Sequence, residues 1–202
     1  MRTFIAIELS EEIREDLAQI QSHLKYSGVL RPCLGRRPEL LSRDGVDVKW
    51  IEKDKIHLTL KFLGDITEED CEKIKSILDR ISGSIRPFEI SIKDIGAFPN
   101  INYPRVIWAG LDKGRAESKI LAEKINEEVL KIGFQKESRP FAPHLTIGRV
   151  RSPKNKDVLK DKILTIQLKA YSLQLIGSIA LFKSTLTPKG PTYTKLHEVN
   201  LR

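Results

Sequence analysis

Two short stretches of this sequence carry the same pair of chemically useful side chains. HLTL begins at His57, and HLTI begins again at His144. The chain holds only four histidines in 202 residues, so this recurrence is far from what composition alone would produce. A repeat of this kind indicates an internal duplication, here of two copies.

Each stretch reads as part of a β-strand, in which side chains two positions apart share a face. His57 and Thr59 therefore project together, and so do His144 and Thr146. Near neutral pH one imidazole can take a proton from water while the other, protonated, gives one to a leaving oxygen. Two threonine hydroxyls can donate to the non-bridging oxygens of a phosphate. This set predicts metal-free phosphodiester chemistry, with a strained cyclic phosphate as a natural substrate.

Two alternatives compete with that interpretation. A single His-x-Thr on a strand is usually a half-exposed surface pair, but two copies with the same letters favour function. A zinc site needs a third ligand at short spacing, as in HExxH, and neither stretch has one. We therefore expect no metal and no cofactor. The other two histidines, His23 and His197, are predicted to lie on the surface.

The elements that must position these residues follow from hydrophobic periodicity and capping residues. Ser10 is a good N-cap, with acidic residues after it, and Gly133 ends a later helix. Helices are predicted from about 11 to 24, 67 to 81 and 116 to 132. Strands are predicted at 2–9, 46–51, 56–63, 88–95, 105–111, 142–150, 163–170, 171–182 and 191–199.

The two halves of this order look alike. In each, a helix leads to a strand carrying one histidine motif, and we expect that strand to be central in a small antiparallel sheet. A pseudo-twofold axis between the two units would bring the motifs face to face across a cleft. Residues 27–45 contain Gly, Pro and four Arg without a clear period, and they are predicted to form a long loop insertion.

Composition sets the outer limits. A length of 202 residues with 40% hydrophobic residues suits one domain, or two small lobes sharing a core. No apolar run is long enough to span a membrane, and no signal peptide is recognised. The two cysteines, Cys33 and Cys71, form no CxxC pair and are expected to be reduced thiols of a cytoplasmic protein. The net charge of +8 favours anionic partners, nucleic acid among them.

With these features established, HLTLKFLG and PHLTIGRV resemble the two signature motifs of the 2H phosphoesterase superfamily. Within it, the chain is similar to the RNA 2′,3′-cyclic phosphodiesterases, once named 2′-5′ RNA ligases. MRTFIAIEL, VKWIEKDKIHLTLKFLGD, GAFPN with PRVIWAGL, and RPFAPHLTIGRV extend the resemblance over most of the chain. The insertion at 27–45 is longer than the family usually has there, and its arginines either extend an RNA-binding surface or belong to a solvated loop.

The resemblance implies a single α+β domain over residues 1–202. Its two intertwined lobes would be antiparallel sheets related by a pseudo-twofold axis, with helices on the outer faces and a central cleft holding both HxTx motifs. It implies metal-independent hydrolysis of 2′,3′-cyclic phosphate ends to 2′-phosphomonoesters. His57 would be the proton donor and His144 the proton acceptor, an assignment that near-symmetry makes easy to reverse. Thr59 and Thr146 would bind the phosphate.

Two further positions follow from the resemblance. Phe62 and Arg149 each lie five residues after a motif histidine, and the family places a ring and a guanidinium there, against the nucleobase and the phosphate. In a flat strand an odd offset points away from the histidine, so a bulge or a strand end must turn both side chains back. The alternative for Phe62 is a place in the buried core.

The partner is expected to be RNA, or a nucleotide with a 2′,3′-cyclic phosphate. The protein is expected to act as a monomer and not to bind membranes. The reverse reaction, joining a 2′-phosphate-type end to a 5′ hydroxyl, would be the ligase activity. Two other functions remain open: a non-catalytic RNA-binding module, and a phosphodiesterase acting on a small nucleotide such as an ADP-ribose cyclic phosphate. Pure RNA binding calls for basic and aromatic residues more than for paired imidazoles.

Overall fold

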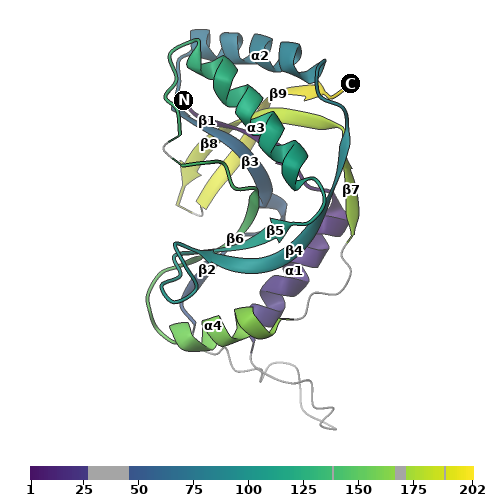
Figure 1. The fold of residues 1–202 in the computed structure, drawn as a ribbon. Helices are drawn as coiled ribbons and strands as arrows, with labels where there is room; N and C mark the ends of the chain where they lie inside the picture. Colours follow the sequence, from purple (N-terminus) through teal and green to yellow (C-terminus); the bar gives the residue numbers. More distant parts are fainter. Residues whose placement is uncertain (27–45, 138, 167–171, 189) are drawn as a thin grey trace.

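The computed structural model describes residues 1–26, 46–137, 139–166, 172–188 and 190–202. The strands form two antiparallel sheets, with helices packed against them (Figure 1). This confirms the predicted α+β class. The predicted insertion at 27–45, with Cys33, lies outside the described residues. No helix in the described part of the chain is long and apolar enough to cross a membrane.

Each sheet contains one of the two motif strands. The four-stranded sheet has the order β3 (His57–Asp65), β1 (Arg2–Glu8), β8 (Ser178–Thr187) and β9 (Gly190–Asn200). The five-stranded sheet has the order β2 (Val48–Trp50), β6 (His144–Val150), β5 (Val106–Leu111), β4 (Phe88–Phe98) and β7 (Leu173–Ile176). β3 and β6 also pack against each other, so the two motif strands meet where the sheets adjoin.

Two of the helices begin where the sequence provides side-chain caps. Ser10 Oγ accepts a hydrogen bond from the Ile13 N–H at the start of α1 (Glu11–Lys25). Thr67 and Asp70 form a reciprocal capping box at the start of α2 (Glu68–Ser82). Such caps satisfy backbone donors that have no partner within the helix. The third predicted helix is present as α3 (Arg115–Leu130), and the structure adds α4 (Lys156–Thr165) and a short 3-10 helix, η2 (Lys53–Lys55).

The helices are exchanged between the two halves of the chain. α3 follows the five-stranded sheet in sequence, yet it packs against α2 and against β3 of the four-stranded sheet. α1 follows β1, but the buried Gln21 on it donates from Nε2 to the carbonyl oxygens of Ile51 and Ile147, at 2.7 and 2.8 Å. α1 therefore supports the strand that carries the second motif. Figure 1 shows α2 and α3 at one end of the molecule and α1 with α4 toward the other.

One hydrophobic core extends across both sheets. It includes the inward-facing residues of both motifs, Leu58, Leu60, Leu145 and Ile147. Burying the apolar surface of such side chains stabilises the fold by about 25 cal/mol per Å². The two motif strands are therefore anchored from the side opposite to their histidines. Cys71 also lies in this core as a free thiol, and burial raises its pKa.

Three sequence-based predictions of secondary structure are wrong. Residues 163–165 of the predicted strand 163–170 end α4, because Leu159 and Ile163 are buried at helical spacing; residues 167–170 lie outside the described part. The predicted strand 171–182 is two strands, since the chain passes from one sheet to the other at Gly177. β3 is an edge strand of its sheet and not a central one, because among the described strands only β1 pairs with it. On its other side, β3 packs beside β6 of the second sheet.

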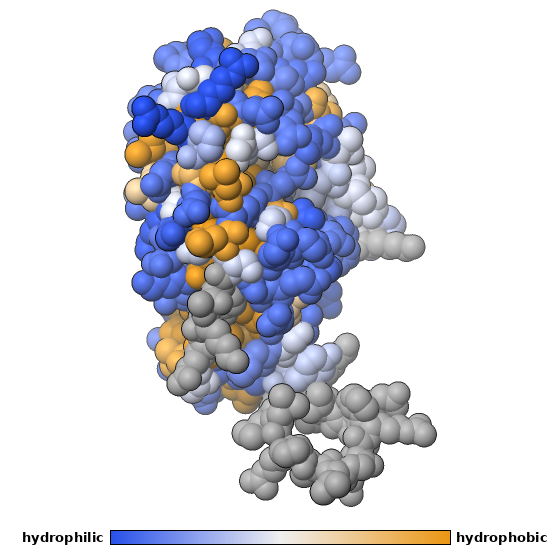
Figure 2. All heavy atoms as spheres, turned by 90° about the vertical axis from the view of Figure 1, so that its right-hand side faces the viewer, coloured by the Kyte–Doolittle hydropathy of each residue, from blue (hydrophilic) through white to orange (hydrophobic). Residues whose placement is uncertain are grey.

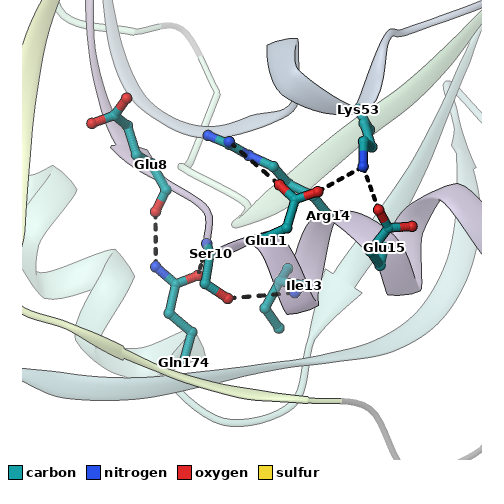
Figure 3. Close-up of polar contacts among 8 residues, drawn as sticks. All are labelled: Glu8, Ser10, Glu11, Ile13, Arg14, Glu15, Lys53 and Gln174. Atoms are coloured by element: carbon teal, nitrogen blue, oxygen red, sulfur yellow. Dashed lines mark hydrogen bonds and ion pairs between the residues drawn. The ribbon is translucent and has the colours of Figure 1, made fainter.

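A glutamine ties the two sheets together near the start of α1. Gln174 on β7 donates to the Glu8 carbonyl oxygen at 2.9 Å and accepts from the Ser10 N–H at 2.8 Å (Figure 3). β7 forms one edge of its sheet and exposes Leu173 and Leu175, and Figure 2 shows a hydrophobic band on the side of the molecule where β7 lies.

Candidate functional site

The two motifs have the same alternation of exposure. His57 and Thr59 on β3, and His144 and Thr146 on β6, are half-exposed, whereas the intervening leucines are buried. Each imidazole thus shares a strand face with a threonine hydroxyl, as the two-residue period predicts.

Both strands have a bulge at the same place in the motif. The register of β3 with β1 skips Leu60, and the register of β6 with β5 skips Ile147. A bulge inserts one residue and so reverses which face the next side chains occupy. Phe62 and Arg149 consequently emerge on the solvent-accessible side, and Phe62 is 59% exposed. The bulge expected from the odd offset is present in both strands, and the alternative that Phe62 is buried in the core is wrong.

A cavity of about 220 Å³ lies between the sheets. It brings together five of the six predicted site residues: His57, Thr59, Phe62, Thr146 and Arg149. The sixth, His144, does not line this cavity; it lies on the strand face of Thr146, two residues earlier. The other lining residues are Arg2, Thr3, Phe4, Lys49, Ile51, Lys55, Ser184, Leu186, Pro191 and Tyr193.

The two histidines are held in the same way. The Nδ1 atom of His57 lies 2.9 Å from the carbonyl oxygen of Lys55, and that of His144 lies 2.7 Å from the carbonyl oxygen of Ala142. A carbonyl oxygen can only accept, so each Nδ1 is the protonated nitrogen of the neutral ring. Each Nε2 is thereby left to accept or donate a proton on the other side of the ring.

The short helix before His57 is tied to α1 by an ion-pair cluster. Lys53 on η2 pairs with Glu11 and Glu15 of α1, with the Glu11 contact at 2.6 Å (Figure 3). η2 ends at Lys55, whose carbonyl oxygen accepts from His57. These exposed pairs contribute little to stability, but they tie η2 to α1 immediately before the motif.

Aromatic side chains pack against both imidazoles. Phe4 stacks on His57 with ring centroids 4.7 Å apart, and Tyr193 meets the same imidazole edge-on at 5.2 Å. Phe98 meets His144 edge-on at 5.0 Å. Phe98 in turn contacts Trp108, which pairs in register with Thr146. The aromatic contacts restrict how far either imidazole can turn.

Burial lowers the pKa of both histidines, because the charged imidazolium loses water contacts. The carbonyl contact at Nδ1 opposes the shift in each pKa. At His144 the positive charge of Arg149 is a further cause of the lowered pKa. In the free protein at neutral pH, both imidazoles are therefore mainly neutral.

The cavity lining is rich in positive charge. Lys55 is paired with Glu52 at 2.9 Å. Within the described ranges, no carboxylate lies within 4.0 Å of the charged groups of Arg2, Lys49 or Arg149. Lys49 and Arg149 are register partners on β2 and β6. Cations left without carboxylate partners in a cavity form a site for an anion such as a phosphate.

Several residues of this site were not predicted from the sequence. Tyr193 comes from the far C-terminal strand and Phe4 from the first strand, and nothing in their local sequence marks them. Burial raises the pKa of Tyr193, so its hydroxyl stays protonated at neutral pH. Among the described residues, no three His, Cys, Asp or Glu side chains gather as a metal-binding group.

Comparisons with known proteins identify the family of this chain. Residues 36–108 and 112–193 match the family model described as LigT like Phosphoesterase. A curated RNA 2′,3′-cyclic phosphodiesterase of Methanocaldococcus jannaschii is 39% identical over 198 residues, which cover 98% of this chain and 99% of that protein. One of Methanothermobacter thermautotrophicus with the same name is 35% identical, covering 100% and 99%.

Solved structures show the same fold. A crystal structure of a protein from Thermus thermophilus matches with a TM-score of 0.75 and 27% identity, covering 100% of this chain and 98% of that one. Escherichia coli LigT, crystallised with 3′-AMP, matches with a TM-score of 0.72 at 22% identity, covering 99% and 97%. The resemblance drawn from the motifs is confirmed: the chain belongs to the LigT-like phosphoesterase family of the 2H superfamily.

Proposed function

We propose that this protein hydrolyses RNA 2′,3′-cyclic phosphate ends to 2′-phosphomonoesters without a metal ion. The observation that carries the proposal is the matched construction of the two motif strands, each with a bulge at the same motif position. Each strand sets an imidazole beside a hydroxyl, and after the bulge presents a ring or a guanidinium. The names of the curated relatives support RNA as the substrate.

The proposed step needs one water molecule. The Nε2 atom of His144 takes a proton from water as its oxygen attacks phosphorus, and the bond between phosphorus and the 3′ oxygen breaks. The protonated Nε2 of His57 gives its proton to that leaving oxygen. Thr59, Thr146 and Arg149 bind the non-bridging oxygens, whose charge is best stabilised by donors already in place. His144 then gives a proton to solvent and His57 takes one up, which restores the starting state.

The direction of proton transfer rests on Arg149. Its charge favours the neutral form of His144, and a neutral imidazole is what a general base must be. The pKa of His57 is not lowered by Arg149 in the same way. This supports His57 as the acid and His144 as the base.

The pH optimum of kcat/KM is expected to lie below 6.5, the usual histidine pKa. The acid limb reports the base, His144, and the basic limb reports the acid, His57. Because both pKa values are lowered, both limbs move to lower pH. Initial rates on a nucleoside 2′,3′-cyclic phosphate measured over a pH range from acidic to mildly alkaline test this. A profile that is still rising on the alkaline side of neutrality would contradict it.

The function itself is tested with an oligoribonucleotide that ends in a 2′,3′-cyclic phosphate. The protein, dialysed against excess EDTA, is expected to open the ring at the same rate as protein supplied with Mg²⁺ or Mn²⁺. Loss of turnover in EDTA with recovery on adding metal would overturn the metal-free mechanism. Tight, salt-dependent RNA binding without product would replace the enzyme with an RNA-binding module.

Three further properties belong to the same proposal. The same ring opening, with a 5′ hydroxyl attacking phosphorus in place of water, would form a 2′–5′ linkage and give ligase activity. Both motifs come from one chain, which supports a monomer as the active form. RNA as substrate supports a cytoplasmic location.

A further inference from the structure

A second cavity lies at the end of β6. It has a volume of about 510 Å³ and is lined by Tyr103, Pro104, Arg105, Val150, Arg151, Ser152, Pro153 and Lys156. Arg149 lines the first cavity, and Arg151, two residues on, lines the second. Two residues along a strand span about 6.6 Å, so adjacent groups on one extended ligand can reach both cavities.

Tyr103 offers an aromatic face in this second cavity. Its side chain is 69% exposed, which is unusual for a large aromatic ring. Lys156 lies over the ring, with Nζ 4.8 Å from the centroid. A ring has two faces, and the exposed remainder is open to a stacking partner. Every nucleobase has such a face.

The loop that carries Tyr103 is held in place. The side-chain oxygen of Asn100 accepts hydrogen bonds from the N–H groups of Asn102 and Tyr103, at 3.0 and 3.1 Å. The N–H of Arg105 donates to the carbonyl oxygen of Phe98 at 2.7 Å, closing the hairpin between β4 and β5. Phe98 is the residue that contacts His144. The hairpin therefore places Tyr103 at a fixed position relative to the second motif.

The charged side chains that line the cavity around Tyr103 are all positive. In the part of the chain that the structure describes, no carboxylate lies within 4.0 Å of the charged groups of Arg105, Arg151 or Lys156. A stacking platform surrounded by cations is the pattern with which proteins bind single-stranded nucleic acid.

We propose that this second cavity is a subsite for the nucleotide preceding the cyclic phosphate end of a single-stranded RNA. Tyr103 stacks on its base, and Arg105, Arg151 and Lys156 contact the phosphates on either side. The inference rests on the proposed function for the identity of the ligand. It predicts that the protein distinguishes an RNA chain from a mononucleotide, which the first cavity alone cannot do.

The test compares two substrates, a nucleoside 2′,3′-cyclic phosphate and a short RNA with the same end. Tyr103→Ala is expected to raise KM for the RNA about tenfold, the loss of one base stack, and to leave kcat and KM for the mononucleotide unchanged. Arg151→Gln is expected to flatten the dependence of log Kd on log salt by about 0.7 for the same RNA carrying a 2′-phosphate. Arg86→Gln is the matched control. It removes one exposed charge just before the first residue of β4, at the opposite end of that strand from the Tyr103 loop. It should leave the KM for the RNA and the salt dependence of Kd unchanged.

The outcomes separate this inference from the function. Equal KM values for the two substrates in the wild type, together with no effect of Tyr103→Ala on the RNA, would overturn the subsite and leave the enzyme standing. A protein that turns over neither substrate would overturn the function, and the salt dependence of RNA binding would still decide the subsite. A loss of mononucleotide turnover in Tyr103→Ala would also contradict the subsite, since the effect would then lie at the first cavity.

Discussion

His57→Ala and His144→Ala are each expected to lower kcat/KM for a 2′,3′-cyclic phosphate by about 10²–10⁴-fold, the usual contribution of a general acid or base. The two imidazoles act in one proton-transfer step, so their losses should not add. The double variant is expected to be about as slow as the slower single variant. Steady-state rates on a nucleoside 2′,3′-cyclic phosphate provide the measurement.

The matched control for these variants is His197→Ala. His197 lies on β9 and its Nε2 contacts Asp79 at 2.9 Å, outside the lining of the cavity. It should retain wild-type turnover. Far-ultraviolet circular dichroism and thermal unfolding must show that all variants are folded, because each motif imidazole packs against an aromatic ring. A folded His57→Ala or His144→Ala protein with turnover near that of the wild type would rule out the two-histidine mechanism.

Arg149→Gln is expected to lower kcat/KM by about 10²-fold, the scale on which removal of one donor to a developing charge acts. The side chain lies in the cavity beside Lys49, with no carboxylate among the described residues within 4.0 Å of its guanidinium. Its full charge is therefore available to a phosphate, which a guanidinium can contact through two parallel N–H groups. Arg149→Lys keeps the charge but not the fork, and should recover part of the loss.

The same variant has a second signature. Arg149 lowers the pKa of His144, so Arg149→Gln should raise that pKa and move the acid limb of the kcat/KM profile to higher pH. Loss of phosphate contact alone would lower the whole profile without moving its acid limb. Turnover close to that of the wild type in Arg149→Gln would contradict a phosphate-binding role.

The motif pairs and the positions of Phe62 and Arg149 could be predicted from the sequence because their constraints are local. Two-residue periodicity places each threonine beside its histidine, and an odd offset demands a bulge. The structure contains that bulge at Leu60 and at Ile147. Gln21 satisfies the Ile147 carbonyl oxygen from a helix far away in sequence, which no local pattern indicates.

What depends on long-range pairing could not be predicted. Gly177 reads as one residue within a continuous apolar strand, yet the chain leaves one sheet and joins the other there. The exchange of α1 and α3 between halves, and the edge position of β3, are set by how the two sheets share one core. Phe4 and Tyr193 contact His57 because the order of strands in the sheet brings β1 and β9 close to it. The aromatic surroundings of the site therefore depend on the tertiary structure.

The most direct measurement of the central claim is phosphorus NMR of the product. The protein is incubated with a nucleoside 2′,3′-cyclic phosphate in excess EDTA, and the phosphomonoester formed is assigned as 2′ or 3′. A 2′-monophosphate would show ring opening at the 3′ oxygen without metal, as proton donation from His57 to that oxygen requires. A 3′-monophosphate, or no product at all, would contradict the proposed mechanism.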